Sequence, residues 1–206
     1  MYSQAKRLAH KLKSCQGFTI GELLLAALFG LIIMATLYGF YRDQLFDLLA
    51  QETKTATLED ARGALDIMVR ELRNAGSWGT GTAPAGCFRV VGATPTLIQV
   101  QADLDGNGDC SSATGEDVTY DLSSSTSTCP GSIIRRNGVC LIANVVTPTG
   151  SLFTYYDSTG TLLAGSPPVN SIKRVQITFA VQVSNPNPNV GGNVTSTLSS
   201  SVAFRN

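Results

Sequence analysis

A charge-free run of apolar side chains near the N-terminus is the strongest pattern in this 206-residue chain. Residues 23–41 form a stretch of 19 residues without Asp, Glu, Lys or Arg. As an α-helix rising about 1.5 Å per residue, this stretch would measure about 28 Å. The hydrocarbon core of a bilayer is about 30 Å thick. The pattern therefore predicts a membrane-spanning helix that is apolar on every side.

The helical pattern continues beyond this run, but only one face stays apolar. The apolar stripe comprises Leu58, Ala61, Leu65, Met68 or Val69, and Leu72. Intervals of three and four residues are typical of an amphipathic helix that buries one stripe. Glu71 belongs to the charged face, which we expect to be exposed to solvent. We predict one helix over residues 18–74, ended by Gly76 and Gly79.

Beyond Gly76 the apolar residues form short runs bounded by Gly, Asn, Asp and Ser, as strands do. Asn137-Gly138 supplies the two positive-φ residues of a tight hairpin turn, and we expect Arg135 and Arg136 at its exposed edge. The expected strands are 88–91, 97–100, 118–122, 133–136, 139–142, 152–156, 162–163, 175–183 and 195–204. The sequence predicts an α+β fold in which an antiparallel sheet covers the stripe of the helix.

Charge is distributed unevenly along the chain. Residues 1–17 carry the basic residues Lys6, Arg7, Lys11 and Lys13 and no acidic residue. Without this segment, eleven basic residues remain against fifteen acidic ones, a net charge of −4. That balance provides no basic face for nucleic acid.

Histidine chemistry is excluded for most of the chain, because the single histidine, His10, also lies in residues 1–17. Ser-His-Asp and Cys-His catalysis and histidine-ligated zinc are therefore excluded beyond this segment. A carboxylate pair would have to carry out any catalysis. We expect a protein that is not an enzyme.

Four of the five cysteines lie in the Ser- and Gly-rich part of the chain: Cys87, Cys110, Cys129 and Cys140. An even number of cysteines after a membrane helix predicts two disulfides in an oxidising compartment. Three connectivities are open, and the sequential one, Cys87 with Cys110 and Cys129 with Cys140, is favoured. The spacings contain no C-x-x-C pair, which argues against a thiolate zinc site.

Glu22 lies at the start of the apolar helix, where an ionised side chain is energetically unfavourable unless it is compensated. An ionised side chain at the centre of a bilayer costs about 2.5–3.5 kcal/mol. A cation fixed at hydrogen-bond distance in a low-dielectric environment compensates such a charge best. We therefore expect Glu22 to pair with a cationic group when the helix is correctly docked.

The run Gly17-Phe18-Thr19-Ile20-Gly21-Glu22, followed by a membrane-length apolar helix, resembles the type IV prepilin signal. Residues 60–76 are similar to the minor pilin W (PilW) group of type IV pili and to the related J pseudopilins of type II secretion. The resemblance implies a type IV pilin-like fold in four parts. These are a cleaved leader (1–17), a membrane and filament-core helix (18–44), the amphipathic half of that helix (45–76), and a disulfide-bonded β region (77–206).

The resemblance also implies how the protein is processed, assembled and located. Prepilin peptidase would cleave after Gly17 and methylate the new amine of Phe18. Glu22 matches the carboxylate that pairs with a subunit's N-terminal amine during assembly. The expected protein is a minor pilin that initiates or caps a pilus together with other minor pilins and the major pilin. It would sit in the inner membrane with its C-terminal domain exported, and then in the pilus at the cell surface.

An acidic, glycine-containing segment offers a candidate calcium loop. Oxygen ligands stand at alternate positions in Asp103, Asp105, Asn107 and Asp109, and the sixth residue is Gly108. This corresponds to the first half of an EF-hand-type loop, in which Asp109 offers its backbone carbonyl. The twelfth position is Thr114 rather than glutamate, so Glu116 or Asp117 would complete the site only in a longer loop. The alternative is a solvated acidic turn.

Two other functions stay open at this point. A pseudopilin of type II secretion shares the same sequence features. A tip-located adhesin or ligand-binding pilin would need an exposed aromatic patch, to which Trp78, Tyr155 and Tyr156 are the candidates. Buried or marginal packing is the commoner role of such side chains.

Overall fold

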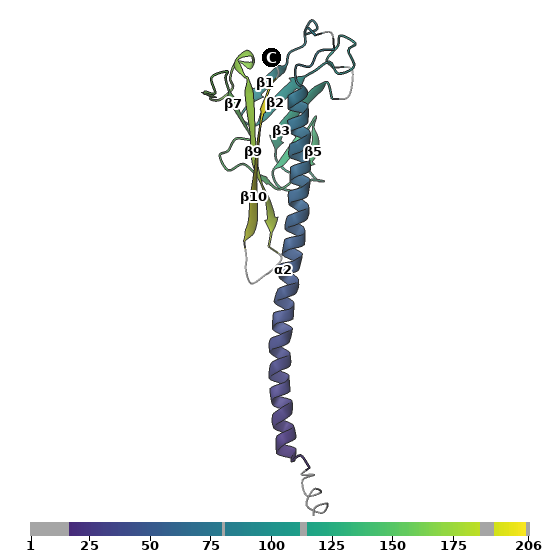
Figure 1. The fold of residues 1–206 in the computed structure, drawn as a ribbon, viewed down its shortest axis with the longest axis vertical. Helices are drawn as coiled ribbons and strands as arrows, with labels where there is room; N and C mark the ends of the chain where they lie inside the picture. The colour runs from purple at the N-terminus through teal and green to yellow at the C-terminus, as the bar shows by residue number, and fades with distance from the viewer. Residues whose placement is uncertain (1–16, 80, 112–114, 186–191, 205–206) are drawn as a thin grey trace, which may run out of the picture. The chain divides into compact units, whose positions relative to one another are not determined.

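The computed structural model describes residues 17–79, 81–111, 115–185 and 192–204 (Figure 1). The chain divides into two compact units, with the boundary between Leu48 and Leu49. Residues 1–16 of the predicted leader, which include its basic residues and His10, lie outside the described residues. Thr114, considered for the calcium loop, also lies outside them.

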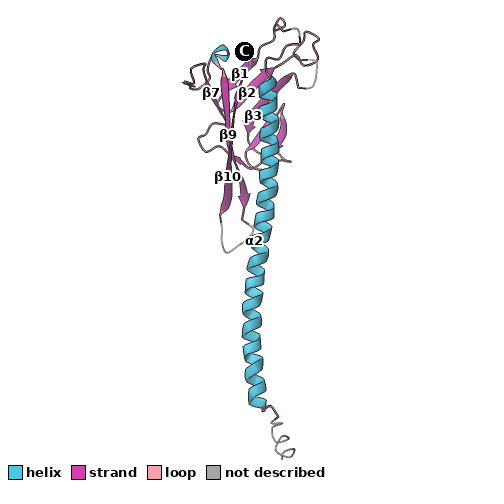
Figure 2. Ribbon diagram, viewed as in Figure 1, coloured by secondary structure: helices cyan, strands magenta, loops and turns pink. Residues whose placement is uncertain are grey.

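One long helix dominates the secondary structure (Figure 2). Helix α2 spans Ile20–Asn74, 55 residues, and confirms the long helix predicted over 18–74. Its start is a capping box, in which the Thr19 N–H donates to Glu22 Oε2 (3.0 Å) and the Glu22 N–H donates to Thr19 Oγ1 (3.3 Å). Its end is followed by Gly76, whose φ of 77° is the left-handed conformation that terminates helices.

The part of α2 in the first unit has the character of a membrane segment. Apart from Phe46, which is half-buried, its side chains in residues 20–48 are exposed. By length and composition, α2 is the helix of the described chain that is long and apolar enough to cross a membrane. Transfer of exposed apolar area of this kind from water to an apolar environment is favourable.

In the second unit α2 buries one face. The buried residues of the helix are Ala61, Ala64, Leu65, Met68 and Leu72. Leu58 and Val69 are partly buried at the margins of the same core. The predicted stripe is therefore confirmed, and Met68 rather than Val69 is its central residue.

The first sheet is antiparallel and follows the chain order β1-β2-β3-β4-β5. Its strands are β1 (Val90–Thr94), β2 (Leu97–Gln101), β3 (Asp117–Ser123), β4 (Ile133–Arg136) and β5 (Val139–Ile142). The predicted hairpin is present, because β4 and β5 pair across Asn137 and Gly138, whose φ angles are 49° and 79°. β5 is the terminal strand of this sheet.

The second sheet has the order β10-β9-β7-β8, with β6 paired to β9. Its strands are β6 (Val145–Val146), β7 (Phe153–Tyr156), β8 (Leu162–Leu163), β9 (Arg174–Ser184) and β10 (Asn193–Ala203), and a 3-10 helix, η1 (Val169–Ser171), precedes β9. The sequence predicted a single sheet, whereas the structure has two. The reason is that β6 follows β5 directly in the chain but pairs with β9.

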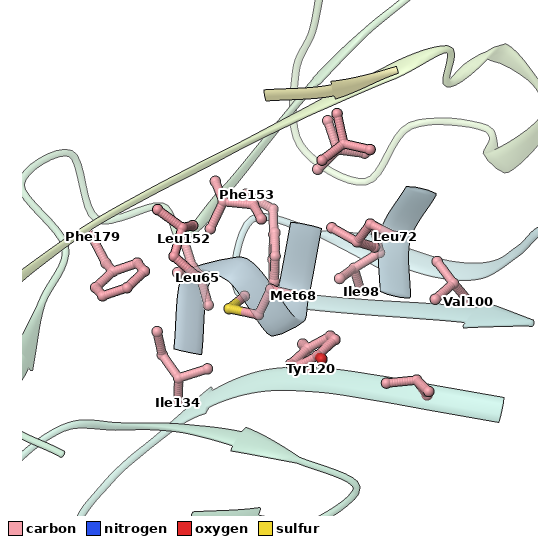
Figure 3. Packing of buried hydrophobic residues seen from close by; sticks show 14 of the residues in the cluster. Leu65, Met68, Leu72, Ile98, Val100, Tyr120, Ile134, Leu152, Phe153 and Phe179 are labelled. Carbon is pink, nitrogen blue, oxygen red and sulfur yellow. The ribbon is translucent and has the colours of Figure 1, made fainter. Parts of the chain in front are cut away.

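The hydrophobic core joins α2 to both sheets (Figure 3). Met68 is fully buried at its centre and lies near Tyr120 of β3. Residues from the first sheet are Ile98, Val100, Tyr120 and Ile134, and those from the second are Phe153 and Phe179, with Leu152 just before β7. This packing holds the C-terminal half of the helix against the sheets. Replacing such a large buried side chain with alanine lowers the free energy of unfolding by about 2–5 kcal/mol.

A polar clamp supplements this core. The Glu71 carboxylate of α2 accepts hydrogen bonds from Arg136 Nε (3.1 Å to Oε1 and 3.0 Å to Oε2) and Nη2 (2.8 Å to Oε1), and a short one from the Tyr120 hydroxyl. Arg135 pairs with Asp121 of the neighbouring strand. The expectation that Glu71 faces solvent and that both arginines lie at an exposed edge was therefore wrong. The guanidinium of arginine presents two parallel N–H donors, a geometry that matches the two oxygens of a carboxylate.

Two disulfides are present in the second unit. Cys87 is bonded to Cys110 with Cα atoms 5.9 Å apart, and Cys129 to Cys140 with Cα atoms 6.7 Å apart. The structure therefore has the sequential connectivity. The first bond joins the loop before β1 to the loop between β2 and β3, and the second joins the loop between β3 and β4 to β5, which contains Cys140.

Candidate functional site

The first candidate site is the start of α2. Phe18 is 82% exposed, and Gly17 and Thr19 beside it are also exposed. The Thr19 hydroxyl donates a hydrogen bond to Glu22 Oε2 at 3.0 Å, in addition to the capping bonds of the backbone. The Glu22 carboxylate is therefore held by its own chain at the positive end of the helix dipole.

This arrangement defines what Glu22 can do chemically. A carboxylate has about four lone-pair positions, so bonds to Thr19 leave acceptor capacity for a second donor. An ammonium group is the donor that gains most, since opposite charges at about 4 Å attract strongly where water is excluded. Glu22 is exposed in the single chain. A neighbouring molecule or a lipid phase would have to supply the exclusion of water.

The second candidate site is the loop between β2 and β3. Carboxylate oxygens of Asp103, Asp105 and Glu116 lie within 4.8 Å of one another. Asp103 is 1% exposed and Glu116 is 0% exposed, whereas Asp105 is exposed. Oxygen ligands in such a cluster suit a hard divalent cation such as calcium or magnesium. The described residues therefore include an acidic cluster that could hold a metal ion.

Backbone N–H groups orient these carboxylates. Asp103 accepts from the Gly106 N–H (2.7 Å) and the Gly108 N–H (3.2 Å), and Glu116 Oε1 accepts from the Leu104 N–H (3.0 Å). The Ala102 N–H donates to the Glu116 carbonyl (2.8 Å), which extends the β2–β3 ladder to the loop. The start of the loop and Glu116 are thereby brought together.

The remaining predicted ligands take other roles. Asn107 Nδ2 donates to Asp105 Oδ2 (3.1 Å), and Asp109 Oδ1 accepts from the Cys110 N–H (2.7 Å). Asp117 accepts from Gln99 Nε2 (2.9 Å) on the neighbouring strand. The cluster therefore unites three of the considered acidic residues, with Glu116 rather than Asp117 as the late carboxylate. The sequence pattern of the loop alone did not decide between those two.

The aromatic residues considered for an adhesive patch do not share one exposed surface. Tyr155 is 1% exposed, and its hydroxyl donates to the carbonyls of Thr94 (2.7 Å) and Leu97 (3.0 Å). Burial raises the pKa of this hydroxyl well above the ordinary tyrosine value. Tyr156 is half-buried beneath the Arg174 guanidinium, 4.3 Å from its ring centroid. Tyr155 is thus a core residue.

The sequence did not predict one polar side-chain cluster, which holds the helix to the first sheet. The clamp of Glu71, Tyr120 and Arg136 joins α2 to β3 and β4. Hydrogen bonding to Glu71 raises the pKa of Arg136, and burial raises the pKa of Tyr120. No local spacing reveals this cluster, because Glu71 and Arg136 lie 65 residues apart.

Comparison of the chain with protein-family models, with curated proteins and with solved structures found no match in any of the three.

Proposed function

We propose that this protein is a structural subunit of a type IV pilus, a minor pilin of the W type. The observation that carries the proposal is a single uninterrupted helix, Ile20–Asn74, that has the Glu22 carboxylate in its first turn and is exposed and free of charge from Leu23 to Tyr41. The Gly17-Phe18 junction before it resembles a prepilin cleavage site. The disulfide-bonded α+β unit that follows is suited to an exported location.

In the proposed mechanism, removal of the leader frees the amine of Phe18. The apolar helix then leaves the lipid and packs among the helices of neighbouring subunits. Glu22 accepts the N-terminal ammonium of a neighbour, and this contact is strong only where water is excluded. An incorrectly placed subunit leaves the carboxylate unpaired in an apolar environment, so the pair selects the correct axial position.

Mass spectrometry of the N-terminus of the protein purified from its membrane tests the proposal. The expected mature chain begins at Phe18 and carries one methyl group on its amine. Recovery of a chain that retains Met1, or of a periplasmic chain that lacks residues 18–44, would contradict the proposal.

Type II secretion is the alternative assembly, because a J-type pseudopilin shares each of these features. Deletion of the protein distinguishes the two assignments. If the protein is a minor pilin, its deletion is expected to reduce the number of pili and to leave protein secretion unchanged. Loss of secretion with normal piliation would assign the protein to the secretion system instead.

We propose in addition that the acidic cluster binds calcium. The two buried carboxylates of Asp103 and Glu116, together with exposed Asp105, place negative charges within 4.8 Å of one another. Like charges at this distance repel, and a divalent cation relieves the repulsion. A bound ion would bridge the start and the end of the 103–116 loop. The cation would therefore serve stability of the exported unit and not catalysis.

A further inference from the structure

A groove lies between α2 and the last strand of the first sheet. Asp60, Ala64 and Ile67 line it from the helix, and Cys140, Leu141 and Ile142 line it from β5. Its volume is about 590 Å³. We refer to these residues, with Glu59 and Gly63 beside them, as the α2–β5 groove. All of them belong to the second unit.

The floor and the open side of this groove favour an extended ligand. Ala64 and Ile142 are buried, while Ile67 and Leu141 are half-buried, so the floor is apolar. β5 is terminal in the order β1-β2-β3-β4-β5 and, among the residues that the structure describes, pairs with β4 alone. A terminal strand presents a row of N–H and C=O groups on which a further strand can form. Val139 at its start is 70% exposed.

The helix side of the groove is acidic. Glu59 and Asp60 line the groove, and both are exposed. Within the described residues the ion pairs are Arg135 with Asp121 and Arg136 with Glu71, and neither involves these two carboxylates. An incoming basic side chain therefore meets two negative charges that have no ion-pair partner among those residues. Charge complementarity of this kind selects partners by sign.

Gly63 leaves open space beside the acidic side of the groove. An added Cβ at this exposed helix position would meet no atom within 4 Å. Glycine costs an exposed helix position about 1 kcal/mol relative to alanine. The open space at Gly63 leaves room for a backbone or a long side chain beside the carboxylates.

From these features we propose that the α2–β5 groove binds an extended segment of a partner protein, which adds to β5 as a sixth strand. On the face that points toward α2, the segment carries apolar residues, which contact the groove floor, and at least one Lys or Arg, which pairs with Glu59 and Asp60. Backbone hydrogen bonds to β5 supply affinity, and the basic residue supplies selectivity. This interaction does not depend on the pilin assignment, so either can fail alone.

The test uses the full chain in non-ionic detergent with two labelled ten-residue peptides. One peptide repeats Val-Val-Lys-Lys, so that each face of the strand carries both valine and lysine, and the other has glutamate in place of each lysine. Fluorescence anisotropy should give an affinity at least tenfold higher for the lysine peptide. Hydrogen exchange should slow at the amides of β5 when that peptide binds. Equal affinities, no binding, or slowed exchange confined to other strands would overturn the proposal.

Matched variants distinguish the contribution of charge to peptide binding from that of the shape of the groove. Glu59→Lys combined with Asp60→Lys should weaken the lysine peptide at least tenfold, whereas Asp66→Lys, an exposed position outside the groove, should change it less than twofold. Gly63→Trp should block binding, and Arg62→Trp should not. Since Gly63 is surrounded by open space, its variant should keep the wild-type melting temperature. Unchanged binding by either groove variant would contradict the proposed position.

Discussion

Glu22 introduces a carboxylate just before a run of 19 uncharged residues, and its neighbour Thr19 already satisfies part of its hydrogen-bonding capacity. A residue that served only to cap the helix would need no partner from another chain. A residue that pairs with a neighbour's ammonium has a second, intermolecular role. Substitution distinguishes the two roles, because capping affects the single chain and pairing affects assembly.

Glu22→Ala is expected to leave cleavage after Gly17 intact and to reduce incorporation into filaments about tenfold, which corresponds to about 1.4 kcal/mol. The physical reason is the loss of an ion pair in a low-dielectric environment. Immunoblots of sheared filaments and of whole membranes measure the ratio. Glu52→Ala, an exposed position on the same helix, is the control. Incorporation of the Glu22 variant at wild-type level would remove the proposed role.

At the acidic cluster, calcium is expected to raise the melting temperature of the full chain by about 5–10 °C at a hundredfold excess over its dissociation constant. Thermal melts in detergent with calcium and with chelator measure this shift. Glu116→Gln should abolish it, because the substitution removes one buried carboxylate charge. Asp157→Asn, in an exposed turn, should preserve it. Identical wild-type melts in the two conditions would show that the loop is only an acidic turn.

The two buried tyrosines predict how the stability of the protein changes at alkaline pH. Burial raises the pKa of both Tyr120 and Tyr155 above the ordinary value of 10.0. The native state therefore favours the neutral hydroxyls, whose stabilising contribution is complete below pH 10 and declines as the pH rises above it. Denaturant midpoints should fall between pH 10 and 12. Tyr155→Phe should be less stable at pH 7 but should show a smaller decline, and an unchanged decline would contradict the assignment.

At the scale of elements, α2 carries two separate surfaces, an exposed apolar one over residues 23–41 and a buried stripe that packs against its own sheets. The apolar stripe and its period were sufficient to predict the helix and its buried face. The hairpin at Asn137 and Gly138 was also predictable, because a tight turn with two positive φ angles restricts the choice of residues. These features depend on neighbours in sequence.

Features that depend on distant partners were not predictable from local pattern. The division of strands into two sheets rests on the pairing of β6 with β9, and short apolar runs do not specify their partners. Glu71 was assigned to solvent because it lies on the charged face of the helix. Its partners Tyr120 and Arg136 follow 49 and 65 residues later. For the same reason the sequence left both Glu116 and Asp117 as candidates for the acidic cluster.

The clamp predicts how firmly α2 is held to the first sheet. Glu71→Leu should lower the free energy of unfolding by about 1–3 kcal/mol, because Arg136 and the Tyr120 hydroxyl lose their acceptor in a partly buried place. Denaturant titration measures the change. Asp66→Leu, on the exposed face of the same helix, should alter it by less than about 0.5 kcal/mol. Equal effects of the two substitutions would contradict the role of the clamp.

At the scale of the whole molecule, the boundary between Leu48 and Leu49 predicts that the second unit folds alone. A chain of residues 49–206 contains the buried stripe, both sheets and both disulfides. It should be monomeric without detergent and should melt cooperatively within a few degrees of the full chain. Scanning calorimetry checks this expectation. A fragment that does not melt cooperatively would mean that residues 20–48 are needed for stability.

The core described for the second unit has a consequence for how the protein folds. The stripe of α2 ends at Leu72, whereas the strands that bury it begin at Val90 and continue to Ala203. The strand residues that pack against the stripe are therefore distant from it in sequence, and such contacts form slowly during folding. Until the later strands pack against it, the apolar stripe is exposed and can associate with other unfolded chains. We expect newly made chains to need a holding chaperone and to aggregate in its absence.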